Sequence, residues 1–179
     1  HRRQRQKRIR DRNDITDTNN QIKACFENVK STKLCTVISN QEGVEAATIE
    51  HFIAALWGFD IDNCIIELDS REVPILDGSS EPYLFLLQSA GKKKQSLYRK
   101  FLKINKKISC EIESNYGKIH STIEPNNFFT INATIDYKNP LIGKQSHSFF
   151  SNKDCFETAI SRARTFALKE EVEYLQKNN

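Results

Sequence analysis

The chain has 179 residues, of which 38% are hydrophobic and 28% charged, and its formal net charge is +4. This composition is typical of a protein with a buried core, and the length fits one domain or two small ones. No apolar run approaches the roughly 18 residues of a membrane-spanning helix, and the first residues lack the apolar segment of a secretory signal.

The basic residues are concentrated at the N-terminus. Residues 1–12 hold seven Lys or Arg and one Asp, about +6, so the remainder of the chain is close to −2. Such a run can bind nucleic acid or phospholipid, but most basic tails are simply solvated. Because no aromatic platform or recognition motif accompanies the run, we expect a disordered tail over 1–12 and no nucleic-acid partner.

The five cysteines are scattered and form no C-x-x-C pair. An odd number of cysteines without a signal peptide predicts reduced thiols, as in a cytosol. A zinc site made of cysteines alone is therefore not expected.

The first elements in chain order are a short strand over 34–38 and a helix over 48–58. In the helix, apolar residues recur at helical spacing, Thr48 can serve as the N-cap and Gly58 as the stop. The residues of this apolar stripe are Ile49, Phe52, Ile53, Leu56 and Trp57.

A strand over 64–68 follows, and then the turn dipeptide Asp77-Gly78. A second helix begins near Ser79 or Ser80, with Pro82 tolerated in its first turn. Beyond a basic connector, the sequence predicts strands over 101–113, 118–124 and 128–137, a helix over 153–163 and a final amphipathic stretch. The predicted class is α+β, in two small units: a first domain over 13–92, a linker over 93–100 and a second domain over 101–179.

Glu50 and His51 place a carboxylate beside an imidazole in the first turn of the predicted 48–58 helix. The field of a helix N-terminus disfavours imidazolium and favours an ionised carboxylate, the forms needed in a metal ligand and a general base. Both residues also have structural readings, as a surface histidine and as an acid that complements the helix dipole. No second ligand lies one turn away, because positions 47 and 55 are alanine.

Three further polar positions invite weaker interpretations. The Thr165 hydroxyl could cap a chain end or donate to a developing oxyanion. Asp136 and His147 show no partner in the sequence.

The strings TIEHFIAALWGFDIDNCIIELDSREVPILDGSSEPYLFLLQSAG, FFTINATIDYKNPLIG, ISRARTFAL and EVEYL occur in this order. Together they resemble the UDP-3-O-acyl-N-acetylglucosamine deacetylase family over about residues 30–176. The resemblance implies two α+β layers with helices sandwiched between sheets. It also implies cytoplasmic, zinc-dependent hydrolysis of the acetamide of UDP-3-O-acyl-N-acetylglucosamine, the committed step of lipid A biosynthesis in Gram-negative bacteria.

By the same resemblance, His51 is a zinc ligand and Glu50 the general base. Thr165 stabilises the oxyanion, and Phe166 lines the wall of the site. Cys35 lies near the metal and Val172 lines the passage for the acyl chain.

The chain also departs from the family pattern. The family's other two zinc ligands belong to an H-K-x-x-D string, which would lie beyond Asn179, and residues 1–12 do not resemble the family's upstream hairpin. We therefore expect a fragment with an incomplete second unit, inactive and weakly zinc-binding by itself. The alternatives are a half-protein that needs a separate C-terminal fragment, a catalytically inactive remnant, and a nucleic-acid binder driven by residues 1–12.

Overall fold

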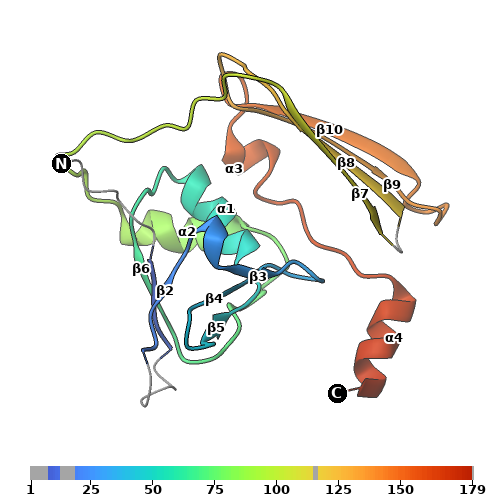
Figure 1. The fold of residues 1–179 in the computed structure, drawn as a ribbon, viewed down its shortest axis with the longest axis horizontal. Coiled ribbons are helices and arrows are strands. Elements are labelled where there is room, and N and C mark those ends of the chain that lie inside the picture. Colours follow the sequence, from blue (N-terminus) through green and yellow to red (C-terminus); the bar gives the residue numbers. More distant parts are fainter. Residues whose placement is uncertain (1–7, 13–18, 115–116, 179) are drawn as a thin grey trace. The chain divides into compact units, whose positions relative to one another are not determined.

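The computed structural model describes residues 8–12, 19–114 and 117–178. The chain divides into two compact units: unit 1 comprises His1–Lys94 and Ile160–Asn179, and unit 2 comprises Gln95–Ala159. Figure 1 shows helices and antiparallel strands together, which confirms the α+β class. No helix in the described ranges is long and apolar enough to cross a membrane.

Unit 1 contains most of the helices and two small sheets. Its strands are β1 (Arg8–Arg12), β2 (Ile22–Lys23), β3 (Val29–Ser31), β4 (Val37–Ser39), β5 (Glu45–Ala46) and β6 (Ile65–Leu68). Its helices are the 3-10 turn η1 (Phe26–Asn28), α1 (Glu50–Gly58), α2 (Glu81–Ala90) and α4 (Lys169–Asn178).

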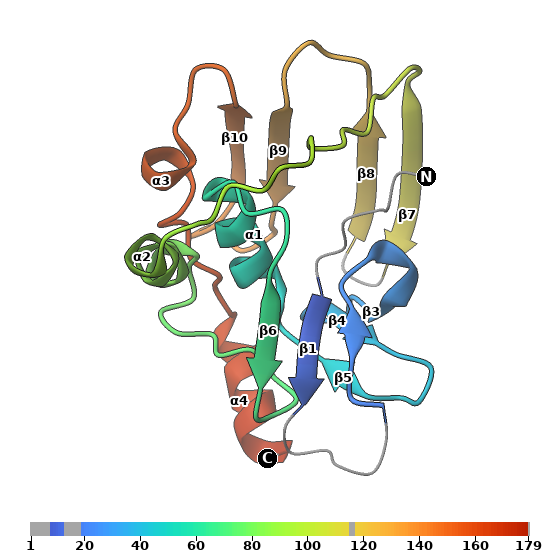
Figure 2. The same ribbon diagram turned by 90° about the vertical axis from the view of Figure 1, so that its left-hand side faces the viewer.

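The two sheets of unit 1 have the strand orders β2-β1-β6 and β3-β4-β5. Strand β1 runs antiparallel to β2 and parallel to β6, and Figure 2 shows β1 alongside β6. Parallel neighbours need a long connection between them, and here it contains the whole second sheet and α1.

Helices α1 and α2 of unit 1 pack against one another, and both contribute side chains to its core. The apolar side chains of this core are almost completely removed from water, which is the main favourable term in folding. The buried hydrophobic residues of unit 1 are Ile22, Val37, Ile38, Val44, Ala46, Ala47, Ile49, Ala55, Leu56, Leu68, Val73, Tyr83 and Leu84.

Helix α1 begins two residues later than the sequence predicts, and Thr48 is not its N-cap. Thr48 has a φ of 57°, in the left-handed region, and the residue before the helix is Ile49. The Thr48 hydroxyl donates to the carboxylate of Glu72 instead of to the helix N-terminus. The predicted cap was wrong because this partner lies 24 residues away in the sequence.

The N-terminal segment also differs from the expected disordered tail. Arg8–Arg12 form β1, whose backbone is paired on both sides, while residues 1–7 lie outside the described residues. The prediction of a disordered tail relied on the side-chain charges. Strand pairing, however, is made by backbone N–H and C=O groups, which are the same whatever the side chain.

The two units can be compared with the predicted domains, whose bounds stay a prediction. The change of unit between Lys94 and Gln95 falls inside the predicted linker 93–100, but residues 160–179 group with unit 1 instead of with the second domain. That regrouping rests on hydrogen bonds between residues 81 positions apart, which chain order cannot reveal.

Unit 2 is built from two antiparallel hairpins, followed by the short helix α3 (Phe156–Ala159). The hairpin strands are β7 (Ile108–Ser114) with β8 (Gly117–Ile123), and β9 (Thr130–Asp136) with β10 (Lys144–Phe150). The sequence predicts the first three strands, whereas β10 escaped it because polar residues fill most of its positions. Helix α3 is much shorter than the predicted 153–163.

The first hairpin has one largely apolar face. In the first hairpin, Ile108 pairs with Ile123 and Ile112 with Ile119, so the four isoleucines share a face. All four side chains are more than half exposed. Among the described residues of unit 2, Phe149 is the one buried hydrophobic side chain.

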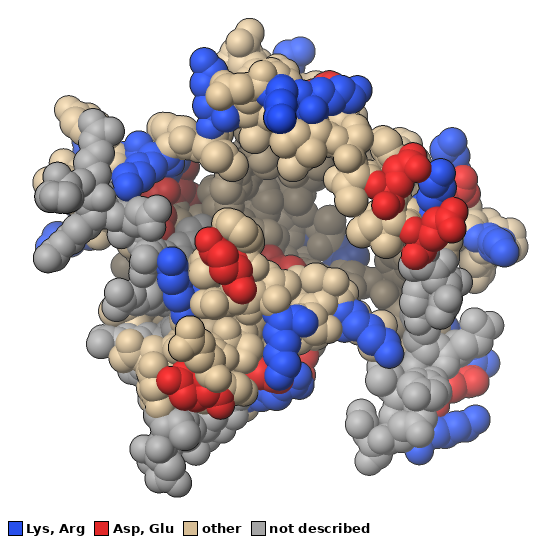
Figure 3. All heavy atoms as spheres, in the orientation of Figure 1, with Lys and Arg blue, Asp and Glu red and all other residues tan. Residues whose placement is uncertain are grey.

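Several charged side chains on unit 1 form ion pairs. Glu45 on β5 accepts from Lys30 at 2.6 Å and from Arg71 at 2.7 Å, which lowers the pKa of its carboxyl. Figure 3 shows acidic side chains (red) among the basic ones (blue) on the face in view. Interspersed charges of this kind are typical of a solvated surface.

Candidate active site

Glu50 and His51 are the first two residues of α1, and both are half-buried. The backbone N–H of Thr36 donates to Glu50 Oε2 at 3.1 Å. This bond places Cys35 and Thr36, just before β4, beside the first turn of α1. The structure thus brings Cys35, Glu50 and His51, all singled out from the sequence, into one neighbourhood.

The backbone leading into this turn is held by residues 71–73. Ala47 donates to the Arg71 carbonyl at 2.9 Å, and Val73 donates back to the Ala47 carbonyl at 3.0 Å. Together with the contact between Thr48 and Glu72, these bonds fix where α1 begins. A left-handed threonine costs energy and persists only where its surroundings hold it in place.

Helix α1 is linked to α2 by an aromatic contact. The rings of Phe52 and Tyr83 meet edge to face, with centroids 5.0 Å apart. Burial raises the pKa of the Tyr83 hydroxyl, which donates to the Pro74 carbonyl. Because Phe52 follows His51 directly and Tyr83 lies in the first turn of α2, this contact joins the Glu50–His51 turn to the start of α2.

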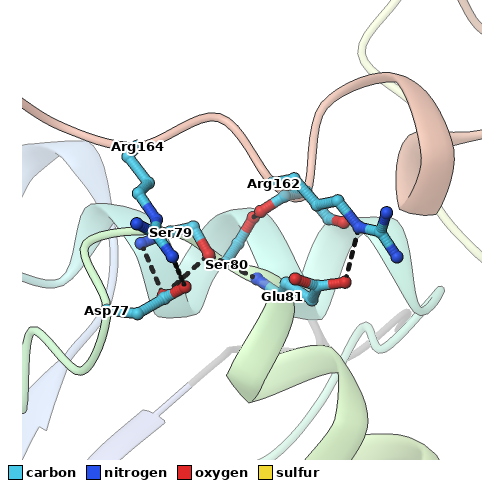
Figure 4. A network of polar contacts seen from close by, with 7 residues as sticks. Asp77, Ser79, Ser80, Glu81, Arg162 and Arg164 are labelled. Atoms are coloured by element: carbon cyan, nitrogen blue, oxygen red, sulfur yellow. Dashed lines mark hydrogen bonds and ion pairs between the residues drawn. The ribbon is translucent and has the colours of Figure 1, made fainter.

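Thr165 contacts the turn that precedes α2. The Thr165 backbone N–H donates to the Gly78 carbonyl at 2.8 Å, and Arg164 Nη2 lies 3.3 Å from Asp77 Oδ2. Figure 4 shows Arg164 and Asp77 pointing toward one another. Thr165 is exposed, and its hydroxyl has no hydrogen bond to the residues that the structure describes.

Two further contacts in Figure 4 fasten the same segment to α2. Both the backbone N–H and the hydroxyl of Ser80 donate to the Ser161 carbonyl, at 3.1 and 3.2 Å. Arg162 Nε lies 2.7 Å from Glu81 Oε1. Ser80 and Ser161 are both buried, so the bonds between them are shielded from competing water.

Asp77 organises the turn in front of α2. Its Oδ1 accepts from both the hydroxyl and the backbone N–H of Ser79, at 2.8 and 3.0 Å. These bonds, the hydroxyl's first, and the nearby Arg164 guanidinium lower the pKa of the Asp77 carboxyl from its ordinary value of 3.8. The Asp77-Gly78 pair, which the sequence presents only as a turn, therefore belongs to the neighbourhood of Thr165.

Two of the positions singled out from the sequence lie outside these contacts. Phe166 follows Thr165 and is 52% exposed, and Val172 lies on α4 and is 39% exposed. Their roles in lining a wall and an acyl-chain passage stay predictions.

A family-model match places the chain among known proteins. Residues 5–179 match the model described as UDP-3-O-acyl N-acetylglycosamine deacetylase. The chain belongs to this family. The match begins well before residue 30 and includes β1, so the prediction that residues 1–12 do not resemble the family was wrong from residue 5 onward.

Three relatives named UDP-3-O-acyl-N-acetylglucosamine deacetylase are each 42% identical to the chain. The one from Idiomarina loihiensis aligns over 84% of this chain and 49% of its own length. Those from Shewanella oneidensis and Shewanella denitrificans each align over 88% of this chain and 51% of their own length. The chain thus spans about half the length of the curated relatives it matches.

The zinc ion that the family resemblance implies does not fit the residues of this chain by themselves. A catalytic zinc needs three protein ligands. No group of three or more His, Cys, Asp or Glu among the described residues could hold a metal ion. His51 is available, since its ring has no hydrogen bond to a described residue, but it stands without the rest of a ligand set.

The structure adds residues that the sequence analysis did not assign to the site. The backbone N–H of Thr36 donates to Glu50, and the carboxylate of Glu72 accepts from Thr48. The hydroxyl of Ser80 donates to the carbonyl of Ser161. A serine or a glutamate in a polar stretch gives no signal of such a distant partner. Gly78 is different, because a glycine after Asp predicts a turn with a positive φ. The sequence does not show, however, that Thr165 contacts this turn.

Proposed function

We propose that the chain provides one part of the active site of a zinc-dependent deacetylase that hydrolyses the N-acetyl amide of UDP-3-O-acyl-N-acetylglucosamine. The observation that supports this most is the Glu50–His51 turn, half-buried and steadied by Thr36, in a chain of this family. A cytoplasmic location and a role in lipid A biosynthesis belong to the same proposal.

Glu50 is the group we assign to proton transfer. Its Oε2 is occupied by the Thr36 N–H, and its Oε1 has no hydrogen bond to a described residue. One oxygen therefore fixes the carboxylate while the other can take a proton from an attacking water. General-base assistance of this kind contributes roughly 10²–10⁴-fold in rate.

Thr165 is the group we assign to the oxyanion. Its backbone is fixed to Gly78, and its hydroxyl stays free to donate where negative charge develops on the amide oxygen. Losing such a donor costs on the order of 10²–10³ in rate. Cys35, Phe166 and Val172 would complete the contacts of this chain with the substrate.

We assign His51 as one ligand of the zinc ion. When bound, the zinc would make a water molecule a better nucleophile for the hydrolysis. The remaining ligands would come from residues outside those described here. Without them the chain has no deacetylase activity and binds zinc weakly. The second candidate is a half-protein that works with a separate C-terminal fragment, or a catalytically inactive remnant; it is compatible with the lack of a three-residue ligand group among the described residues.

The experiment measures acetate release from UDP-3-O-acyl-N-acetylglucosamine with the chain alone and with the separately produced C-terminal half of the Shewanella oneidensis relative. We expect turnover only in the mixture. Glu50→Gln should lower the rate of acetate release roughly 10²-fold or more, since glutamine keeps an oxygen for the Thr36 N–H but cannot take the proton. Glu67→Gln on β6 is the matched control.

Two results would contradict the proposal. Turnover that Glu50→Gln leaves unchanged would remove Glu50 from the reaction. A mixture that assembles, binds zinc and still releases no acetate would favour the inactive remnant.

A further inference from the structure

Thr165 lies in a stretch, residues 163–168, that contains no helix or strand. The position of such a residue cannot come from its own secondary structure, so it depends on contacts with other segments. Two such contacts, from Thr165 itself and from its neighbour Arg164, lead to Gly78 and Asp77 in the turn before α2.

Gly78 makes the closest of these contacts. Its carbonyl accepts the Thr165 N–H at 2.8 Å. Its φ is +82°, a conformation that favours glycine, and a Cβ at this position would lie 3.3 Å from Thr165 Cγ2. Glycine therefore permits the turn and also lets the Thr165 side chain rest directly on it.

Asp77 adds a charged contact beside this one. One of its oxygens closes the turn through Ser79, and the other faces Arg164, the neighbour of Thr165. The turn and the segment of Thr165 are thereby joined by an ion pair next to the backbone hydrogen bond.

We propose that Gly78, supported by the ion pair between Asp77 and Arg164, is the positioning residue that sets where the Thr165 hydroxyl stands. The assignment of that hydroxyl to the oxyanion rests on the proposed function. The positioning itself is a property of unit 1 and is tested without turnover.

The test compares Gly78→Ala with Gly43→Ala in the 179-residue chain. Gly43 has the same φ of +82°, and a Cβ there meets nothing within 4 Å. Both alanines therefore impose the same backbone strain, and only the one at position 78 presses on Thr165. The readouts are the amide hydrogen-exchange rate and the methyl NMR resonance of Thr165.

We expect Gly78→Ala to shift the Thr165 methyl resonance and to speed exchange of the Thr165 amide by about tenfold, the effect of losing one ordinary hydrogen bond. Gly43→Ala should leave both signals unchanged. Equal changes in the two variants, or an unmoved Thr165 in Gly78→Ala, would overturn the proposal.

Asp77→Asn provides a second variant in case Gly78→Ala fails to fold. Asparagine can still close the turn through its oxygen, but it directs an amide group, which cannot accept, toward Arg164. We expect faster exchange of the Thr165 amide, with no change in the control Glu45→Gln, which weakens an ion-pair cluster elsewhere in unit 1. An unchanged Thr165 amide in Asp77→Asn would overturn the role of the ion pair.

The activity assay separates this inference from the proposed function. If Thr165 moves in the NMR test but Thr165→Ala leaves acetate release by the mixture unchanged, the positioning stands and the oxyanion role fails. If Thr165→Ala removes activity while Gly78→Ala leaves Thr165 in place, the function stands and the positioning fails.

Discussion

The left-handed conformation of Thr48, two residues before Glu50, leads to a prediction with an unusual sign. Replacing a residue by glycine normally destabilises a protein more than replacing it by alanine, because glycine gains more freedom in the unfolded chain. At Thr48, where φ is 57°, we expect the reverse order. Thr48→Gly should be less destabilising than Thr48→Ala.

The magnitudes follow from the contacts of Thr48. Both variants lose the hydrogen bond to the Glu72 carboxylate, worth about 1.5 kcal/mol at the lower end for a charged acceptor because Glu72 is exposed. Both also lose a buried methyl group, about 0.8 kcal/mol. Alanine keeps the left-handed strain of about 1–2 kcal/mol. Glycine removes this strain, but the greater freedom of glycine in the unfolded chain destabilises the fold by roughly 0.5–1 kcal/mol. Glycine also loses the buried Cβ that alanine keeps, so the net difference favours glycine by only about 0.5 kcal/mol.

The assay is urea unfolding followed by the fluorescence of Trp57. This is the single tryptophan of the chain, and because it lies on α1 it reports on unit 1. Thr36→Ala and Thr36→Gly serve as the matched pair, since Thr36 is not among the residues with positive φ and should show the ordinary order. A Thr48→Gly variant as unstable as Thr48→Ala, or more so, would refute the assignment of strain to this turn.

Three other outcomes follow from the structure. Because the pKa of Asp77 is lowered on folding, its carboxylate stabilises the fold above about pH 4 and loses this effect as the pH falls through the lowered value; the melting temperatures of the wild type and Asp77→Asn should therefore converge in acid. Cys25, whose thiol pKa is raised by burial, should react with iodoacetamide at pH 8 more slowly than the exposed Cys110, and equal rates would contradict this. Ile112→Thr should reduce binding of the dye ANS by the apolar face of the first hairpin, whereas Glu111→Thr on its opposite face should not.

The elements that could be predicted from the sequence are those whose causes are local. Helix α1 and strand β6 carry apolar residues at the spacing of their own periodicity, and α2 has Pro82 in its first turn and ends before Gly91. The adjacency of Glu50 and His51 is likewise visible in the sequence. Each of these signals lies within one or two turns of the residues it describes.

The features that could not be predicted depend on partners far along the chain. Thr48 adopts its left-handed turn because Glu72 and the backbone of 71–73 hold it there. Residues 160–179 join unit 1 because Ser161 meets Ser80 across 81 positions. Sequence periodicity carries no record of such contacts, so neither the grouping of residues 160–179 with unit 1 nor the hydrogen bond of Thr165 to Gly78 could be predicted.

The grouping of residues 160–179 with unit 1 places Thr165 in the same unit as Glu50. Gln95–Ala159 separate Thr165 from Glu50 in sequence, yet both residues belong to unit 1. The described contacts between them run from Glu50 along α1 to Phe52, through Tyr83 to the start of α2, and through Gly78 to Thr165. Each step of this route lies within unit 1, so the described contacts that relate the proposed base to the proposed oxyanion donor are all internal to this unit. We therefore expect substitutions on the exposed isoleucines of the first hairpin, such as Ile112→Thr, to leave the Thr165 signals where they are.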